Sequence, residues 1–315
     1  MRISIKSAAV AVGLAAMTFS SALADYPEQP VQFIVPWPPG DLEDVLTRLI
    51  AEEMQSETGV AAAVVNKPGG GGGPFPGAAE VARSDPDGYT IGSFVIGVPT
   101  VGPLVGIEGF TRETFEPIGI FLTYPFVLAA SKEAPYSNMA ELAAHAKDNK
   151  VALGHFGYGL VPTRASVIAG QELGFEFGSE AAFDALDCNT LASGDADVIN
   201  TTIQLILPCL DRVKVLASVT ESRIALVPDV ATLGEQVPGA EIALWNGLFV
   251  PQGTPQAVKD KVAAVAEKVV MGERAKQIAA ETGAIIYWQD ANTAAARIDA
   301  DYAKIEEMFR RMGDL

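Results

Sequence analysis

The chain has 315 residues, with 22 lysines and arginines against 39 aspartates and glutamates, and a formal net charge of −17. This acidic balance argues against nucleic acid or anionic lipid as a partner, because both require a basic surface. Hydrophobic residues make up 49% of the sequence, which argues against intrinsic disorder and supplies a core for one large domain or two ordinary ones.

Residues 1–24 have the layout of a secretory signal peptide. Arg2 and Lys6 precede an apolar run over 8–19, and an A-x-A pattern ending at Ala24 marks the cut. The alternative, a retained anchor helix, is disfavoured because the run is too short to span a bilayer comfortably. There is no cysteine near the cut, so we do not expect a lipoprotein. We therefore expect a periplasmic protein, soluble after cleavage, whose mature chain has 20 basic and 39 acidic residues and a net charge of −19.

Strand and helix patterns alternate through the first hundred mature residues. The expected elements are a strand at 31–35, a helix from about 41, a strand at 60–65, a helix at 78–83 and a strand at 90–96. A proline-rich loop follows the first strand, and a run of five glycines at 69–73 follows the second. This alternation predicts an α/β fold with a largely parallel sheet.

Two long extended runs, 118–130 and 242–251, predict strands that cross between two lobes. Between and after them we expect helices at 138–147, 163–173, 184–192, 255–271 and 291–312, and strands at 151–153, 197–201 and 213–219. The predicted lobes are 25–122 with 249–315, and 123–248. A cleft between two such lobes is a common small-molecule site.

Seven short motifs occur in an order that resembles one known family. They are Val35-Pro36-Trp37-Pro38-Pro39-Gly40 with Asp44 and Arg48, Asn66-Lys67-Pro68-Gly69, Pro86-Asp87-Gly88-Tyr89-Thr90, Gly157-Tyr158-Gly159, Arg223 with Pro228-Asp229-Val230 and Thr232, Trp245-Asn246-Gly247, and Gly253-Thr254-Pro255. Together they resemble the substrate-binding receptors of tripartite tricarboxylate transporters, the Bug family.

The resemblance implies a two-lobed periplasmic binding protein of the type II-like, Venus-flytrap kind, with two crossing hinge strands. It implies no catalysis and no cofactor. Such a receptor is expected to be a monomer that binds a small organic acid and hands it to the membrane subunits of a transporter. A sensor subunit with a signalling partner, or an exported hydrolase, are the alternatives; no G-x-S-x-G or H-E-x-x-H motif supports the hydrolase.

The chain departs from the family at expected pocket positions. Where the family has a small-residue loop, this sequence has Gly40-Asp41-Leu42-Glu43. After Gly157-Tyr158-Gly159, Leu160 replaces the family's serine, and Thr163 replaces the histidine that usually follows in the helix. A further stretch near Asp184 also differs. The kind of acid that the receptor binds therefore cannot be carried over from the family.

Two loops, 39–43 and 157–163, each precede a helix and supply candidate ligand contacts. Helix N-termini present N–H donors and a partial positive charge, which suit a carboxylate. The candidate binding residues are Trp37, Pro39, Gly40, Asp41, Leu42, Glu43, Ser93, Phe94, Gly157, Tyr158, Gly159, Thr163 and Asp184.

Several of these candidates have a purely structural alternative. Asp41 either caps its helix or faces the cleft, where it would disfavour a dianion. Trp37 either stacks on the ligand or packs at the hinge, and Tyr158 either binds a carboxylate or caps its own loop. Ser93 and Phe94 either close the cleft or belong to the core. His155 is expected to be a structural histidine.

The two cysteines, Cys188 and Cys209, are expected to pair in an oxidising compartment, with two buried free thiols as the alternative. Two cysteines and two histidines make a metal site improbable.

Overall fold

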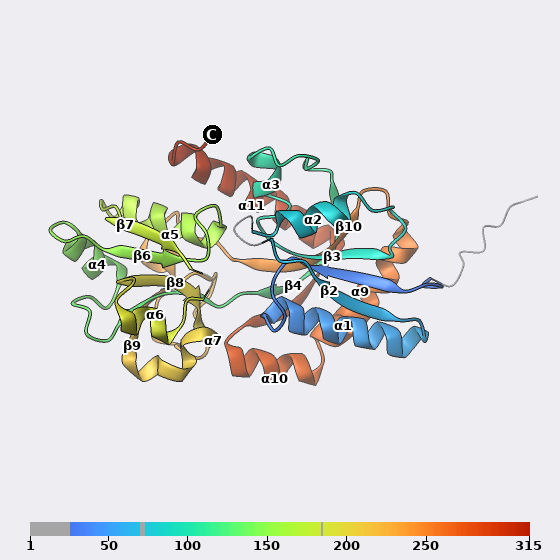
Figure 1. The fold of residues 1–315 in the computed structure, drawn as a ribbon, viewed down its shortest axis with the longest axis horizontal. Coiled ribbons are helices and arrows are strands. Elements are labelled where there is room, and N and C mark those ends of the chain that lie inside the picture. The colour runs from blue at the N-terminus through green and yellow to red at the C-terminus, as the bar shows by residue number, and fades with distance from the viewer. Residues whose placement is uncertain (1–25, 70–72, 184) are drawn as a thin grey trace, which may run out of the picture.

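The computed structural model describes residues 26–69, 73–183 and 185–315, so the predicted signal peptide lies outside the described residues. In the described part, the strands form two separate sheets, each with helices packed around it (Figure 1). This arrangement agrees with the two-lobed α/β fold expected from the sequence. No helix among these residues is both long and apolar enough to cross a bilayer.

The larger sheet has six strands in the order β11-β4-β10-β3-β1-β2. Their bounds are β1 Val31–Val35, β2 Ala62–Asn66, β3 Thr90–Val95, β4 Phe115–Thr123, β10 Trp245–Pro251 and β11 Ile285–Asp290. The strand β1 pairs in parallel with β2 and β3, whereas β10 runs antiparallel to β3 and β4, and β11 antiparallel to β4.

The smaller sheet has five strands in the order β7-β6-β8-β5-β9. They are β5 Phe126–Ser131, β6 Ala152–His155, β7 Ser179–Ala182, β8 Val198–Thr202 and β9 Val213–Ser218. The strand β6 is parallel to β7 and β8, and β5 is antiparallel to β8 and β9.

The expectation of a largely parallel sheet is wrong, because both sheets are mixed. Strands joined by a helical crossover run parallel, but β10 enters the six-stranded sheet from the other half of the molecule. It therefore lies between β3 and β4 in the opposite direction. The hydrophobic pattern of a strand does not encode the direction of its neighbours.

Helices cover the faces of both sheets (Figure 1). They are α1 Leu42–Thr58, α2 Phe75–Ala82, α3 Val101–Leu104, α4 Met139–Ala146, α5 Val161–Glu172, α6 Cys188–Ser193, α7 Ile203–Ile206, the 3-10 helix η2 Leu207–Arg212, α8 Leu233–Gln236, α9 Gln256–Val270, α10 Glu273–Thr282 and α11 Ala291–Arg311. The helices α1 and α9 pack against each other, and α11 packs on β4 and reaches α5 of the other half.

The chain crosses between the sheets at two places. The strands β4 and β5 are separated only by Tyr124 and Pro125, so the apolar run expected at 118–130 is divided between the two sheets. The chain returns before β10, whose residues are all buried. The exact lobe boundaries drawn from the sequence remain predictions.

The core of the six-stranded sheet is rich in aromatic rings. Phe94 packs edge-on against Phe115 and stacked on Phe249, with centroids 5.1 and 5.8 Å away, and Trp245 stacks on Phe249 at 6.3 Å. Burying such large side chains contributes much of the stability of a core. This core fixes the ends of β3 and β10, from which residues of the candidate site arise.

Candidate functional site

The first candidate loop, between β1 and α1, is tied to the end of the neighbouring strand. The parallel register places Asn66 opposite Val35, where the loop begins. The Asn66 side-chain amide donates to the carbonyl of Trp37 at 3.0 Å and to the Asp44 carboxylate at 2.8 Å. Asn66 thus holds the loop from the side.

Asp44 and Arg48 complete this anchor from the first turns of α1. The Asp44 carboxylate accepts the N–H of Gly40 at 2.9 Å, and Arg48 bonds both of its oxygens at 2.8 and 3.0 Å. Burial would raise the pKa of Asp44, but the hydrogen bonds from Arg48, Gly40 and Asn66 outweigh it and lower the pKa. An ionised Asp44 therefore fixes the path of the loop.

Asp41 occupies the N-cap position of α1, yet its side chain makes no capping hydrogen bond. The residue as a whole is exposed. Partial burial of its carboxyl among neighbouring groups, and then the negative charge of Asp44, raise the pKa of Asp41. The capping alternative for Asp41 is therefore not realised in the structure, and its carboxylate is free of a structural task at the helix end.

Glu43 is the second residue of α1 and is only 3% exposed. Burial first, and then the charge of Asp41, raise the pKa of Glu43 to about 8. The pKa of Tyr124 is raised well above its usual value by burial and by the Glu43 carboxyl. This pair therefore holds a proton at neutral pH and lies where the chain crosses between the sheets.

A chain of hydrogen bonds continues from Tyr124 under the loop. The Tyr124 hydroxyl donates to Asn246 at 3.2 Å, Asn246 donates to the Ser93 hydroxyl at 2.8 Å, and the hydroxyls of Ser93 and Thr47 lie 2.9 Å apart. The Thr47 hydroxyl also lies 2.5 Å from the carbonyl oxygen of Glu43. This buried network joins α1, β3 and β10 directly beneath the first loop.

The remaining first-lobe candidates divide between surface and core. Pro39 and Gly40 are exposed, Trp37 is half-buried, and Leu42 is buried. The indole N–H of Trp37 is buried without a hydrogen-bond partner among the described residues. Phe94 is fully buried in the aromatic core, which is the packing alternative, so we do not retain it as a cleft residue.

The second candidate loop joins β6 to α5. Thr163 is 1% exposed, and its hydroxyl donates to the carbonyl of Gly157 at 2.8 Å, so it closes the loop. The N–H of Leu160 donates to the same carbonyl at 3.1 Å. Leu160 is the N-cap of α5 and supplies no side-chain cap. Gly159 is exposed, and Tyr158 is 40% exposed at the outer side of this loop.

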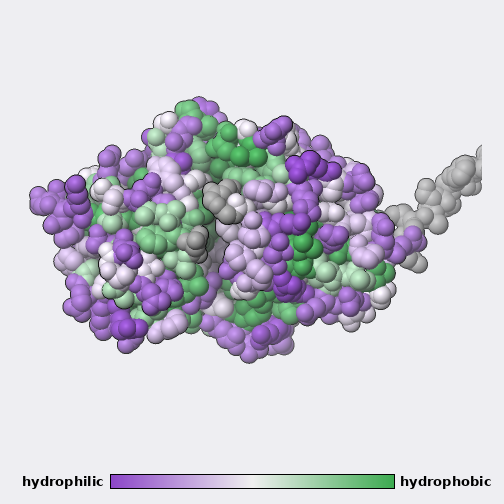
Figure 2. All heavy atoms as spheres, viewed as in Figure 1, coloured by the Kyte–Doolittle hydropathy of each residue, from purple (hydrophilic) through white to green (hydrophobic). Residues whose placement is uncertain are grey.

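The two halves approach each other where Gly73 lies beside the second candidate loop. A methyl group added at Gly73, at the end of the glycine run, would lie 3.9 Å from the Leu160 side chain. The glycine run of one half therefore ends beside the second candidate loop of the other. The surface is hollowed between the two halves on the face shown in Figure 2. The structure thus brings segments distant in sequence to one place.

His155 ends β6 just before the second loop and is 2% exposed. Its Nε2 lies 2.5 Å from the Glu180 carboxylate, and its Nδ1 has no partner among the described residues. A buried histidine tied to a neighbouring strand fits the structural role expected of it. Asp184, the remaining candidate, lies outside the described residues.

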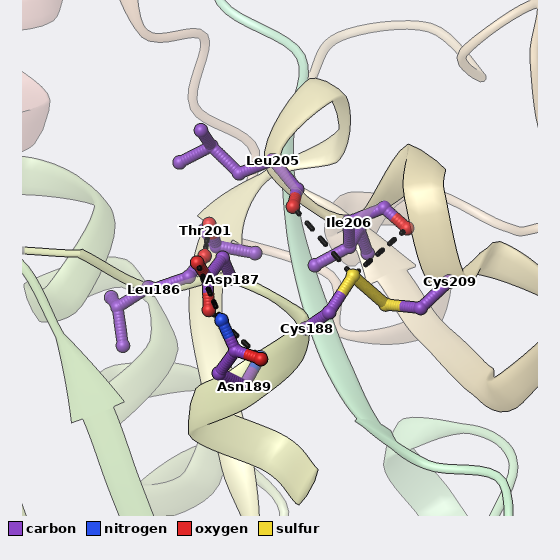
Figure 3. The surroundings of a disulfide bond; sticks show 8 residues. All are labelled: Leu186, Asp187, Cys188, Asn189, Thr201, Leu205, Ile206 and Cys209. Atoms are coloured by element: carbon purple, nitrogen blue, oxygen red, sulfur yellow. Dashed lines mark hydrogen bonds between the residues drawn. A yellow bond between two sulfur atoms is a disulfide. The ribbon is translucent and has the colours of Figure 1, made fainter.

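A disulfide joins Cys188 to Cys209, with Cα atoms 5.9 Å apart (Figure 3). It links the start of α6 to η2, across β8 and α7 in sequence. Asp187 caps α6 by accepting the N–H of Asn189 at 2.8 Å. The bridge therefore joins two helical segments that pack on the smaller sheet. No group of three or more His, Cys, Asp or Glu side chains in the described segments could hold a metal ion.

Sequence reasoning missed the residues that hold the loops. Asp44 and Arg48 were noted only as parts of a motif, although their i, i+4 spacing is a signal for an ion pair on a helix. Asn66 could be found from the rule that parallel strands end at the same edge of a sheet. Asn246 was noted only within the motif Trp245-Asn246-Gly247, and Tyr124 carries no comparable local signal.

One family model and several known proteins are similar to this chain. The model of the family described as "Tripartite tricarboxylate transporter family receptor" matches residues 46–313. A UPF0065 protein of Bordetella pertussis is 31% identical over 259 residues, which cover 78% of each chain.

Solved structures agree with this assignment. The periplasmic binding protein BugD superposes with a TM-score of 0.77 at 27% identity, covering 91% of this chain and 99% of its own. A Rhodopseudomonas palustris protein solved with adipate shares the fold with a TM-score of 0.79 at 23% identity, covering 92% of this chain and 99% of its own.

Proposed function

The chain belongs to the family of tripartite tricarboxylate transporter receptors, and from this premise we propose that it binds a small organic carboxylate between its two halves and delivers it to a membrane transporter. Members of this family are substrate-binding receptors and not enzymes. The delivery step, the periplasmic location and the monomeric state are parts of the proposal.

One observation carries the proposal: two loops, one from each half, lead into the helices α1 and α5, and neither helix has a side-chain cap at its N-terminus. Helix N-termini without a cap leave backbone donors for an anion. The position of Gly73 beside the Leu160 side chain supports the view that the segment at Gly73 and the second loop border one cleft.

The ligand's charge should be limited by Asp41. Its exposed carboxylate stands at the entrance of α1 and is not used as a cap. It would repel one carboxylate of a dianion and attract an ammonium or hydroxyl group. We therefore propose a carboxylic acid that also carries such a group, in preference to a simple dicarboxylate such as the adipate bound by the Rhodopseudomonas palustris protein.

The proposal is tested by a thermal-shift screen of the mature chain, residues 25–315. Dicarboxylates, hydroxy acids, amino acids and aromatic acids would be added at millimolar concentration, and hits confirmed by calorimetry. A ligand present at 100 times its Kd stabilises the folded state by about 2.7 kcal/mol, which a melting curve resolves. If no acid of these four classes shifts the melting temperature, the receptor proposal is contradicted.

The role of Asp41 is tested with Asp41→Asn. We expect the affinity for a dicarboxylate to rise about 3- to 10-fold relative to that for an amino acid, because one nearby charge is removed. Asp85→Asn is the matched control, since Asp85 is an exposed aspartate away from both loops. An unchanged ratio of the two affinities would remove Asp41 from the recognition model while leaving the receptor proposal intact.

A further inference from the structure

Arg164 is a buried cation in an unfavourable place. It lies in the first turns of α5 and is only 7% exposed. A positive charge near a helix N-terminus opposes the helix dipole, and a buried charge needs partners to offset its lost hydration. Neighbouring groups must therefore offset the loss of hydration of the Arg164 guanidinium.

Its partners come from the two sides that meet at α5. The guanidinium carbon lies 4.1 Å from the ring centre of Tyr158, in the second candidate loop, and 4.8 Å from that of Phe309, near the end of α11. Its Nη1 atom forms an ion pair with Asp314 and lies 3.7 Å from the sulfur of Met312. Apart from Tyr158, these partners all belong to the last residues of the chain.

Residues at and just after the end of α11 form ion pairs with both ends of α5. Arg311 forms an ion pair with Glu172, the last residue of α5, while Asp314 holds Arg164 near its start. Beside these pairs, α5, α11 and residues 239–242 line a partly open pocket of about 400 Å³ that includes Ala165, Ile168 and Met308. The two ion pairs add polar links between the helices next to this pocket.

Helix α11 also packs in the other half of the molecule, on β4 of the six-stranded sheet. Phe309, near the end of α11, is 1% exposed and belongs to a core cluster that includes residues of both halves. A second ion pair, Arg297 to Glu221 at 2.8 Å, joins α11 to the segment after β9. Figure 1 shows the red C-terminal helix extending from one half toward the other.

We propose that Arg164 is a positioning residue that transmits the placement of the α11 C-terminus to the ligand loop through the ring of Tyr158. The proposal rests on the proposed function only in calling this loop a ligand loop. Arg164 needs no contact with the ligand. Its guanidinium lies over the ring of Tyr158 and pairs with Asp314, so the position of the loop depends on the position of the C-terminal segment.

The test measures hydrogen exchange of the ligand-free protein, so it does not depend on any ligand. The N–H groups of Leu160 and Arg164 are bonded to Gly157 and Leu160, and they report whether the loop is ordered. In Asp314→Asn we expect these amides to exchange about tenfold faster, while the amides of both sheets keep their wild-type rates. Arg164→Met should show the same local effect, more strongly.

Conservative and control variants separate a positioning role from a structural one. Asp314→Glu keeps the carboxylate and should restore the slow exchange. Glu306→Gln removes a carboxylate that pairs with Arg310 on the exposed side of the same helix, and it should change nothing in the loop. Should Arg164→Met fail to fold, Asp314→Asn still decides, because Asp314 lies outside the helices and its side chain is one-third exposed.

Either of two outcomes overturns the proposal: unchanged exchange of the loop in Asp314→Asn, or an equal acceleration throughout the five-stranded sheet, which would make the contact merely structural. Once a ligand is known, its affinity should fall about fivefold in Asp314→Asn and recover in Asp314→Glu. If the loop responds as expected but no organic acid binds, the coupling stands and the proposed function fails.

Discussion

Glu43 shows how the burial of one acidic residue can make the stability of the fold depend on pH. Glu43 belongs to the segment 40–43, where the sequence departs from the family. The structure buries it beside Tyr124, and the charges of Asp41 and Asp44 act on it. Since burial favours the neutral acid, folding keeps Glu43 protonated at a pH where the unfolded chain would ionise it.

Replacing this residue should therefore change how stability depends on pH. The pKa of Glu43 is raised from 4.5 to about 8, so its contribution is fully present below pH 4.5 and is lost as pH rises through 8. We expect Glu43→Gln to be more stable than wild type at pH 8, by roughly 1–4 kcal/mol, and equal to it near pH 4.

Urea unfolding of both proteins across this range measures the difference. Glu267→Gln, on the exposed face of α9, is the control and should run parallel to wild type. A pH-independent difference between Glu43→Gln and wild type would show that Glu43 does not titrate as described.

At the residue scale the sequence could name positions but not the faces to which they belong. Ser93 and Phe94 are neighbours on β3, and both are fully buried. Ser93 joins the polar network beneath the first loop, whereas Phe94 faces the aromatic core. Alternation along a strand predicts that they point to opposite faces, but not that helices cover both faces.

Individual elements were predictable where their pattern was strong. The strands at 31–35 and 90–95 and the helices α1, α9 and α11 lie close to their expected positions. In contrast, α10 and β11 went unrecognised. The helix α10 buries only Ala275 and Ile278, and β11 is a half-buried edge strand, so neither has a clear apolar period.

The disulfide is an element-scale feature with a measurable effect. It closes a loop with a sequence separation of 21 between α6 and η2. In the chain-entropy model, a loop of this length contributes about 3 kcal/mol by restricting the unfolded chain. We expect reduction to lower the urea midpoint accordingly.

The matched control is the double variant Cys188→Ser with Cys209→Ser, which should unfold at the midpoint of the reduced protein and ignore the reductant. If the oxidised and reduced forms unfold at the same urea concentration, the bridge does not stabilise the fold.

For the whole molecule, the negative net charge disfavours the approach of the anion that the local site is proposed to bind. The chain carries −17 in total, yet we propose that it binds an anion at two helix ends. Short-range donors can outweigh a distant charge because salt screens exposed charges beyond about 10 Å at 0.1 M. The net charge should then act on the rate of encounter more than on the bound state.

Association with an acidic ligand should therefore become faster as salt is added. Between about 20 mM and 500 mM sodium chloride we expect a 3- to 10-fold rise in the association rate of a dicarboxylate, measured by stopped flow, and little change for a zwitterionic amino acid. A rate that falls with salt would instead indicate a locally positive entrance.

Whole-molecule architecture was the level at which the sequence was most informative, because the order of many weak motifs is specific. It indicated an α/β fold of two halves joined by crossing strands, and the family assignment agrees. It could not indicate that the C-terminal segment returns to pair with Arg164 of α5, since Arg164 and Asp314 are 150 residues apart and share no pattern.

The place of β10 in the larger sheet has a consequence for the order in which the molecule folds. This strand lies between β3 and β4, so β1, β2, β3 and β4 cannot form a continuous sheet until residues 245–251 have been made. The five strands of the smaller sheet come from the intervening stretch and need no later strand. Contacts between segments so far apart in sequence form slowly. A nascent chain should therefore complete the smaller sheet first and hold the larger one open until nearly its whole length has emerged.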